Sequence, residues 1–489
     1  MPYLADLEQS GIPTAMIVFN EETEKLKHDS VIFGIPKLRF VVASRNSLGG
    51  VSEADKLIEP VLDALTRPLS DEEKATGKWA PAQPRVLFEG TLEDAEEFYD
   101  QEIQIPRLLG APFSKYSDGL PVVVPTEERV EKMLKGTSHR PDELITIQRD
   151  TKLGAGAAFA AVGEGEAVKK KGDVVTFMPM YRTATVEQVA VNAVMAGCKP
   201  AYFPVVLAMA ESGGGTGDGR GGGGAWIVSG PIYKEIGMNV TNFIFGPGNK
   251  VNKTLGRVGS LMWRNLGGYE ETISTITTMG SPITNGGFIY AEYAEGLPKG
   301  WLGLNEELGF NKDESVLMTA MAGSWGLGQQ HMPGVYRSLQ RTGHGAIARY
   351  LNVKGVPGPH NYLEYLVKDI WATHEGGFTL VLPQQIAQDL CDYGFKSKES
   401  IYEWFWKQSF EPVAKYRMRG MGDFTTNGWL AIEKTSGKPW RDLPDDYMVP
   451  VAGNDPMRSF NIVVINMEET APARYGGGKG QAFSIDGWR

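Results

Sequence analysis

The sequence predicts an α/β protein, because short apolar runs typical of buried strands alternate with helical patterns along most of its 489 residues. Residues 1–75 predict an incomplete Rossmann-like unit, and residues 118–489 predict a larger mixed α/β domain with glycine-rich loops. Residues 76–117 indicate a charged linker that contains one helix. The composition is that of a globular protein, with 42% hydrophobic and 22% charged residues.

Charge and cysteine content exclude several classes of protein. The formal net charge of -10 argues against a nucleic-acid-binding surface, which needs a basic patch. No apolar run is long enough to cross a bilayer, and the first residues lack the charged-then-apolar pattern of a signal peptide, so a cytoplasmic location is expected. Cys198 and Cys391 form no CxxC pair, which disfavours a structural zinc site or a disulfide framework.

The N-terminal part predicts helices and strands in alternation, and residues 4–10 are expected to form the end of its first helix. Strands are expected at 14–19 and 38–43, and helices at 22–33 and 52–65. A parallel pair of strands leaves much of its apolar surface uncovered. We therefore expect another part of this chain, or a separate small partner subunit, to complete the sheet.

The central region predicts helices with clear start signals. Thr126 and Thr185 are good N-cap residues, and Gly197 ends the helix that Thr185 opens. The segment 201–211 predicts a second helix or a buried segment, and further elements are a helix at 92–101 and a strand at 118–125.

The segment Ser212–Gly224 is the most glycine-dense part of the chain. Its simplest interpretation is a flexible surface hairpin or linker. The alternative is a mobile lid or backbone nest beside a ligand, with Asp218 and Arg220 as its charged groups.

The segment 239–268 predicts a binding site for a small polar or anionic molecule. It indicates a short strand at 242–245, a Gly-Pro-Gly turn, and a cationic helix that Asn249 caps. A glycine turn before a cationic helix start presents N–H groups and positive charge to an anion. The alternative is an amphipathic helix with a solvated basic face. The candidate binding residues are Gly246, Gly248, Asn249, Asn252, Arg257 and, from the preceding helix, Asn192.

The C-terminal half predicts strands at 288–292, 315–322, 378–382, 447–452 and 460–466, and helices at 367–372, 383–393 and 398–408. Its histidines have no metal-binding spacing, so the sequence assigns neither a metal nor a cofactor. These histidines are His331, His344, His360 and His374.

Three residues are candidates for catalysis. Glu292 ends a buried strand, where a carboxylate can act as general acid or base or hold a cation. Cys198 and Glu187 belong to the 185–196 helix and its exit. Cys198 lies at a helix C-terminus, where no dipole lowers the pKa of its thiol, so a packed, inert thiol is the alternative. Solvated loop carboxylates are the expectation for Glu306 and Glu307.

Several ordered motifs resemble the bacterial UGSC family, which is named for a Gly-Ser-Cys motif that contains selenocysteine or cysteine. The longest is TVEQVAVNAVMAGCKPAYFPVVLA at 185–208, and others are DGLPVVVPTEERVEKML at 118–134 and GPGNKVNKTLGR at 246–257. The N-terminal GIPTAMIVF at 11–19 is similar to the second half of that family's first domain. The motif itself is absent from this chain.

The resemblance implies the larger subunit of a heteromeric enzyme. A small partner subunit would supply the redox motif, and the chemistry would be redox or reductive bond cleavage by its thiol or selenol. Two departures weaken this implication: the chain has AEYAE at 291–295, and Asn305 stands where the family has histidine. The alternatives are a non-redox lyase or hydrolase that uses Glu292, with or without a metal, and a non-catalytic scaffold.

Overall fold

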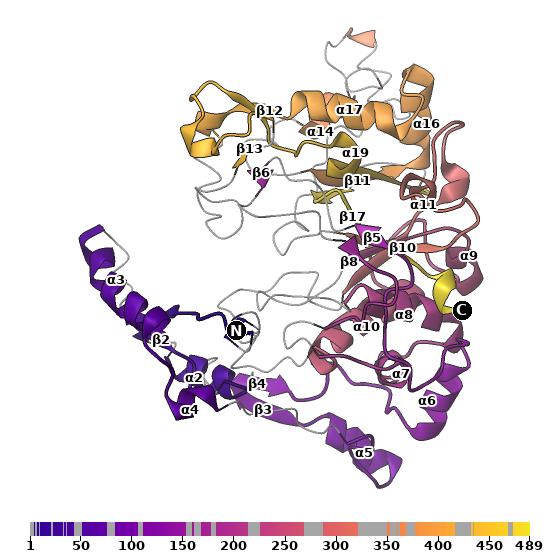
Figure 1. Cartoon of the computed structure of the whole chain (residues 1–489). Helices are drawn as coiled ribbons and strands as arrows, with labels where there is room; N and C mark the ends of the chain where they lie inside the picture. Colours follow the sequence, from indigo (N-terminus) through magenta and orange to yellow (C-terminus); the bar gives the residue numbers. More distant parts are fainter. Residues whose placement is uncertain are drawn as a thin grey trace. The chain divides into compact units, whose positions relative to one another are not determined.

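A computed structural model confirms the α/β class, with helices and sheets in both of its compact units. The first unit lies within Met1–Phe113, and the second within Ser114–Gly268 and Ile276–Arg489 (Figure 1). The structure describes residues 4, 7–8, 10–20, 23–32, 34–35, 37–43, 51–75, 84–105, 111–152, 159–160, 168–177, 182–213, 225–267, 287–320, 350–352, 359, 362–367, 377–415, 432–433, 435–467 and 473–489.

The first unit is built on a parallel pair of strands. β1 (Met16–Phe19) pairs with β2 (Phe40–Ala43), and α2 (Thr23–Ile32) connects them. Val18, Leu26, Ile35 and Leu38 form its small core. The remaining elements are α3 (Val51–Thr66), α4 (Asp71–Lys74), α5 (Leu92–Tyr99) and the paired strands β3 (Glu102–Ile105) and β4 (Ala111–Ser114).

The second unit contains a four-stranded and a three-stranded sheet. The order β17–β10–β8–β9 joins Lys479–Ser484, Val316–Ala320, Ala225–Ser229 and Phe288–Ala291. The order β15–β11–β16 joins Phe460–Ile465, Phe378–Pro383 and Ala473–Gly476. β8 and β9 run parallel, as do β11 and β15, whereas β10 is antiparallel to β8 and β17. Short ladders also pair β12 (Phe410–Pro412) with β14 (Met448–Pro450), β5 (Thr151–Lys152) with β7 (Val168–Lys169), and β6 (Phe159–Ala160) with β13 (Ile432–Glu433).

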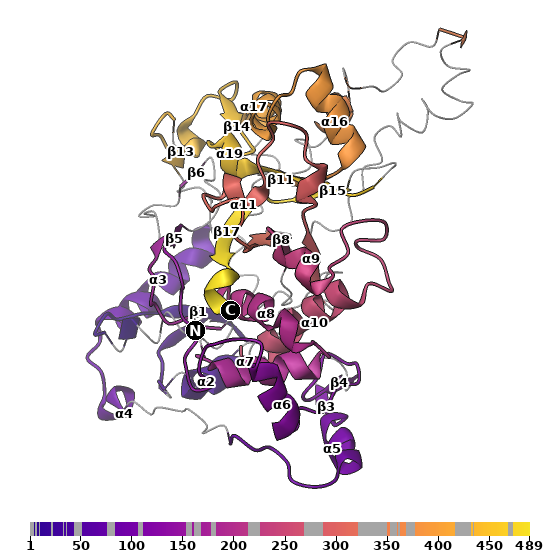
Figure 2. The ribbon, with the colours of Figure 1, turned by 90° about the vertical axis from the view of Figure 1, so that its right-hand side faces the viewer.

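Helices cover the outer side of each sheet (Figures 1 and 2), and apolar side chains from both sheets pack against one another. The buried α8 (Phe203–Glu211) lies against β10 and β17, beside α7 (Val186–Met195) and α10 (Lys250–Asn265). α16 (Gln384–Tyr393) and α17 (Lys398–Gln408) share a core with β11 and β15. A second core joins the facing sides of the two sheets. The remaining helices are α6 (Glu127–Leu134), α9 (Ile232–Ile236), α11 (Leu304–Glu307), α14 (Tyr362–Val367) and α19 (Pro456–Ser459).

The structure corrects two predicted strands. The segment 242–245 is a series of turns, in which Phe243 has a positive φ of 59° and its carbonyl accepts from the Gly246 N–H. The segment 118–125 forms no ladder, because its backbone bonds to helices instead: Val123 N–H donates to the carbonyl of Met195. The sequence also did not predict β16 and β17, whose glycines interrupt the apolar pattern.

The helix start signals are confirmed where the structure describes them. Thr126 accepts from Arg129 N–H, and Thr185 forms a complete capping box with Gln188. Predicted features at 214–224, 268 and 368–372, and the four C-terminal histidines, lie outside the described residues.

Candidate functional site

Glu292 lies directly after β9 and is completely buried, with 0% of its surface exposed. One carboxylate oxygen accepts from Ser229 Oγ at 2.9 Å and from the Leu304 N–H at 2.7 Å. The other accepts from Lys398 Nζ at 2.8 Å. The predicted catalytic carboxylate is therefore fixed by three donors from three different elements.

Lys398 links Glu292 to a second carboxylate. It is the first residue of α17, which Ser397 caps, and its Nζ also lies 3.2 Å from Oε2 of Glu307, the last residue of α11. Lys479, the first residue of β17, lies 3.4 Å from the other oxygen of Glu307. The four charges alternate along one chain of contacts. Glu307 is only 11% exposed, so the expectation of a solvated carboxylate there was wrong.

This chain of charges lies along the edge of β15 that is opposite to β11. Lys479 Nζ donates to the Phe460 carbonyl at 3.3 Å, and Tyr402 OH accepts from the Ile462 N–H at 3.1 Å. Tyr402 OH also donates to Glu307, at 3.4 Å, and the Lys479 ammonium lies 4.0 Å from the centre of the Tyr402 ring. We call Glu292, Glu307, Lys398, Tyr402 and Lys479 the edge cluster.

The environment separates the pKa values of the two lysines. Burial lowers the pKa of Lys479 to about 8, since the attraction of Glu307 only partly opposes it and Lys398 repels the same charge. Burial also acts on Lys398, but the carboxylates of Glu292 and Glu307 outweigh it and raise the pKa of that lysine. Burial and the nearby Glu307 raise the pKa of Tyr402. Lys479 is thus the lysine of the cluster whose pKa is shifted toward neutral pH.

The predicted anion-binding side chains make contacts within the protein. Arg257 donates to both oxygens of Asp118, at 2.8 and 2.9 Å, and to the carbonyls of Leu120 and Pro121. Asn252 bonds to both backbone groups of Asn239.

The rest of that predicted site is also tied to the fold. Asn192 accepts from Asn265 and donates to the Gln188 carbonyl. Asn249 does not cap α10 with its side chain, which corrects the prediction: its amide donates to the Ile244 carbonyl at 3.4 Å. Gly248 has a positive φ of 81° after Gly246 and Pro247, as a tight turn requires.

Cys198 and Glu187 lie on α7 and its exit, and neither is among the contacts of Glu292. Burial raises the pKa of the Cys198 thiol to about 12, which opposes formation of a nucleophilic thiolate. Glu187 is half-buried in the first turn of α7, where its backbone N–H donates to the Pro141 carbonyl. The partners of Glu292 within the described residues are Ser229, Leu304 and Lys398.

Sequence reasoning found Glu292 but missed Lys398, Lys479 and Tyr402. One signal was present, because Lys398 occupies the first turn of α17, where the helix dipole disfavours a cation. A lysine in that position indicates a compensating carboxylate nearby. No comparable signal marks Lys479, which lies within a run of glycines.

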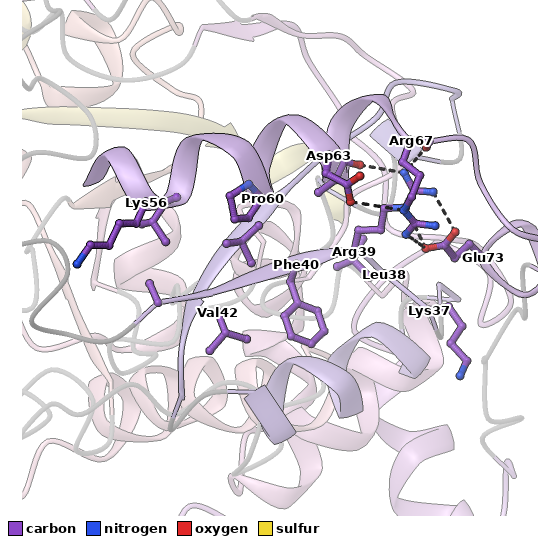
Figure 3. A pocket seen from close by; sticks show the side chains of 14 residues that line it. Lys37, Leu38, Arg39, Phe40, Val42, Lys56, Pro60, Asp63, Arg67 and Glu73 are labelled. Carbon is purple, nitrogen blue, oxygen red and sulfur yellow. Dashed lines mark hydrogen bonds and ion pairs between the residues drawn. The ribbon is translucent and has the colours of Figure 1, made fainter. Parts of the chain in front are cut away.

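The first unit contains a groove of about 700 Å³ between β2 and α3 (Figure 3). Arg39 lies at one end, where it pairs with both oxygens of Glu73 at 2.9 Å and donates to the carbonyls of Ala64 and Pro68. Arg67 contacts the same carboxylate. This end of the groove therefore joins α3 to α4, and its charges are already paired.

No protein-family model, no curated protein and no solved structure matches this chain. Within the described ranges, no group of three or more His, Cys, Asp or Glu residues is arranged to hold a metal ion. No helix in the same part of the chain has the length and apolar character that a membrane crossing requires.

Proposed function

We propose that this chain is an enzyme subunit that carries out acid–base chemistry on a small polar substrate at the edge cluster, as a non-redox lyase or hydrolase. The observation that carries the proposal is the placement of Lys479, which contacts Glu307 and the edge of β15 and has a pKa lowered to about 8. A lysine with such a pKa changes its protonation state at physiological pH, as general acids and bases must.

The other members of the edge cluster would hold Lys479 and the two carboxylates in place. Lys398 remains charged between two carboxylates and holds Glu292 and Glu307 in place. Tyr402 anchors the Lys479 ammonium to the strand edge through its ring and its hydroxyl. Lys479 would then transfer the proton, and Glu307 would stabilise its charged form.

The test is an activity screen of the purified chain against lyase and hydrolase substrates between pH 6 and 10. An activity that rises through about pH 8 and is lost in Lys479→Met supports Lys479 as a base. Lys415→Met is the matched control, because Lys415 is half-exposed and pairs with Glu411, which lies outside the edge cluster. An activity that Lys479→Met leaves unchanged would refute the proposal.

A second candidate is a redox enzyme completed by a partner subunit, which the UGSC resemblance implies. The first unit supports it, because its sheet has two strands among the described residues, and α3 leaves apolar side chains exposed. Ile58 is 52% exposed and Leu62 is 47% exposed. A small cytoplasmic partner carrying the Gly-Ser-Cys motif would cover this surface and supply the thiol or selenol.

Native mass spectrometry of the chain co-expressed with its neighbouring genes separates these candidates. A stable complex with a small cysteine- or selenocysteine-containing chain supports the redox enzyme. A homo-oligomer or monomer whose activity depends on Lys479 supports the acid–base enzyme and excludes the redox enzyme. A complex whose activity survives loss of both Glu292 and Lys479 would indicate a scaffold.

A further inference from the structure

Two buried polar side chains near the edge cluster have no hydrogen-bond partner among the residues that the structure describes. Asn461 is 0% exposed, and neither the nitrogen nor the oxygen of its amide is bonded. Ser459 is equally buried, and its hydroxyl is also unbonded. Buried amides and hydroxyls are nearly always hydrogen-bonded in folded proteins. Two such groups so close in sequence indicate that another molecule satisfies them.

The side chain of Asn461 points into the space between the two sheets. It lies in register with Thr379 of β11, which lies in register with Tyr475 of β16. These residues share a face with Val463 and Val381, which pack against β8, β9 and β10. Asn461, Thr379 and Tyr475 thus form a polar row across the sheet, and this row continues to the facing sheet.

Tyr475 OH lies 2.5 Å from Tyr290 OH of β9, so the polar row spans the space between the sheets. Asn461 directly follows Phe460, whose carbonyl accepts from Lys479. The side chain of Asn461 therefore belongs to this row, and its backbone directly follows a residue that the edge cluster contacts.

The charges of the edge cluster exclude an anion as the best ligand here. Glu292 and Glu307 balance Lys398 and Lys479, so the cluster is neutral when both lysines are protonated. The three donors of the Lys479 ammonium have three acceptors within reach: the carbonyls of Met457 and Phe460 and the carboxylate of Glu307. Neither lysine of the edge cluster is therefore free to pair with a buried anion.

We propose that Asn461 and Ser459 bind the head group of a neutral primary carboxamide. The ligand oxygen would accept from Asn461 Nδ2, its N–H would donate to Asn461 Oδ1, and Ser459 would supply a further hydroxyl contact. This inference rests on the proposed function, since it names the substrate class of the same site. It places the carboxamide beside Lys479, the group that exchanges a proton.

Propionamide and propionate are suitable probes, because they have the same shape and differ in charge and donor groups. Calorimetry on the full chain at pH 7 should show propionamide binding at least tenfold more tightly than propionate. Asn461→Leu should abolish the difference, and Ser459→Ala should reduce it. Ser260→Ala is the matched control, since Ser260 Oγ is also buried and unbonded but belongs to α10.

The outcomes distinguish this inference from the proposed function. Equal affinity for the two probes, or no binding of either, would mean that the site holds water only and would overturn the inference. If Asn461→Leu does not fold, Ser459→Ala provides the same comparison. Loss of the pH-dependent activity in Lys479→Met, with propionamide still preferred, would retain the carboxamide site and assign the chemistry to Lys479.

Discussion

Lys398 Nζ lies 2.8 Å from Oε1 of Glu292, and both side chains are withdrawn from solvent. The two residues are 106 positions apart, and the contact joins the end of β9 to the start of α17. A buried ion pair gives little net stability, because desolvation offsets most of the attraction, but its loss leaves an uncompensated charge. The pair therefore fixes the position of α17 relative to the end of β9, and it contributes little to the free energy of folding.

Lys398→Met should lower the free energy of unfolding by about 3–5 kcal/mol, because it leaves two buried carboxylates without their shared cation. The double variant Lys398→Met/Glu292→Gln should recover part of this loss, since the glutamine oxygen can still accept from Ser229 or Leu304. Urea unfolding of the two single variants and the double variant gives the coupling free energy. Strictly additive changes would show that the two side chains do not interact in solution.

Lys479 should titrate near pH 8, well below an ordinary lysine, because burial disfavours its charged form. Its pKa is lower in the folded chain than in the unfolded chain, so the folded state should gain stability as the pH rises from about 8 to 10.5. The gain is on the order of 3 kcal/mol relative to Lys479→Met, which lacks this titration. Urea unfolding of both proteins across this range measures it, and parallel curves would contradict the shifted pKa.

The sequence was sufficient for the class of fold and for the position of Glu292 at the end of a strand, because both depend on local patterns, whereas the catalytic role of Glu292 stays a prediction. Alternating apolar runs marked β9, and the carboxylate at its end followed directly. Lys479 joins Glu307 only through the pairing of β17 with β10, and glycines conceal that strand in the sequence. Contacts set by such long-range pairing leave no local signal.

For Arg257 the local pattern was clear, because it belongs to the polar stripe of α10, but its partner Asp118 is distant in the sequence. The basic stripe of α10 indicated a solvated cation, yet Asp118 lies 139 positions away and binds it through both carboxylate oxygens. A helical pattern shows which residues share a face but not what that face contacts. The predicted substrate contact of Arg257 therefore stays a prediction.

Arg257→Ala should lower the free energy of unfolding by about 1.5–3 kcal/mol, since it removes charged hydrogen bonds to Asp118 and to two carbonyls. Arg257→Lys should restore less than half of this, because an ammonium cannot reproduce the fork of a guanidinium. Thermal unfolding of both variants measures the effect. A variant of unchanged stability that no longer binds substrate would support the anion-binding role instead.

Glu211 should titrate near pH 7, because burial raises its pKa to about 7 despite the hydrogen bonds that it accepts from Gln148 N–H and Trp488 Nε1. Its pKa is higher in the folded chain than in the unfolded chain, so stability from this group should be lost as the pH rises from about 4.5 to 7. The neighbouring Lys169 opposes the shift only in part.

The fluorine resonance of 5-fluorotryptophan at position 488 should report this titration, with a midpoint near pH 7 that Glu211→Gln abolishes. Trp301 is the internal control, because its indole N–H donates to the uncharged carbonyl of Phe395 at 2.9 Å. A Trp488 resonance that does not move between pH 5 and 9 would show that Glu211 does not titrate in this range, which would contradict the shifted pKa.

Gly377→Ala should disturb the carboxamide site from a distance, because a Cβ at Gly377 would lie 1.4 Å from the carbonyl oxygen of Ser459. Backbone cannot yield as a flexible side chain can, so the start of β15 must shift, at a cost of about 1–3 kcal/mol or more. Gly476→Ala is the matched control, since a Cβ there meets no atom within 4 Å. Its stability should change by less than about 1 kcal/mol.

Propionamide affinity should fall in Gly377→Ala and be kept in Gly476→Ala, because Ser459 and Asn461 move only in the first variant. Equal behaviour of the two variants would mean that the close approach to Ser459 does not position the site.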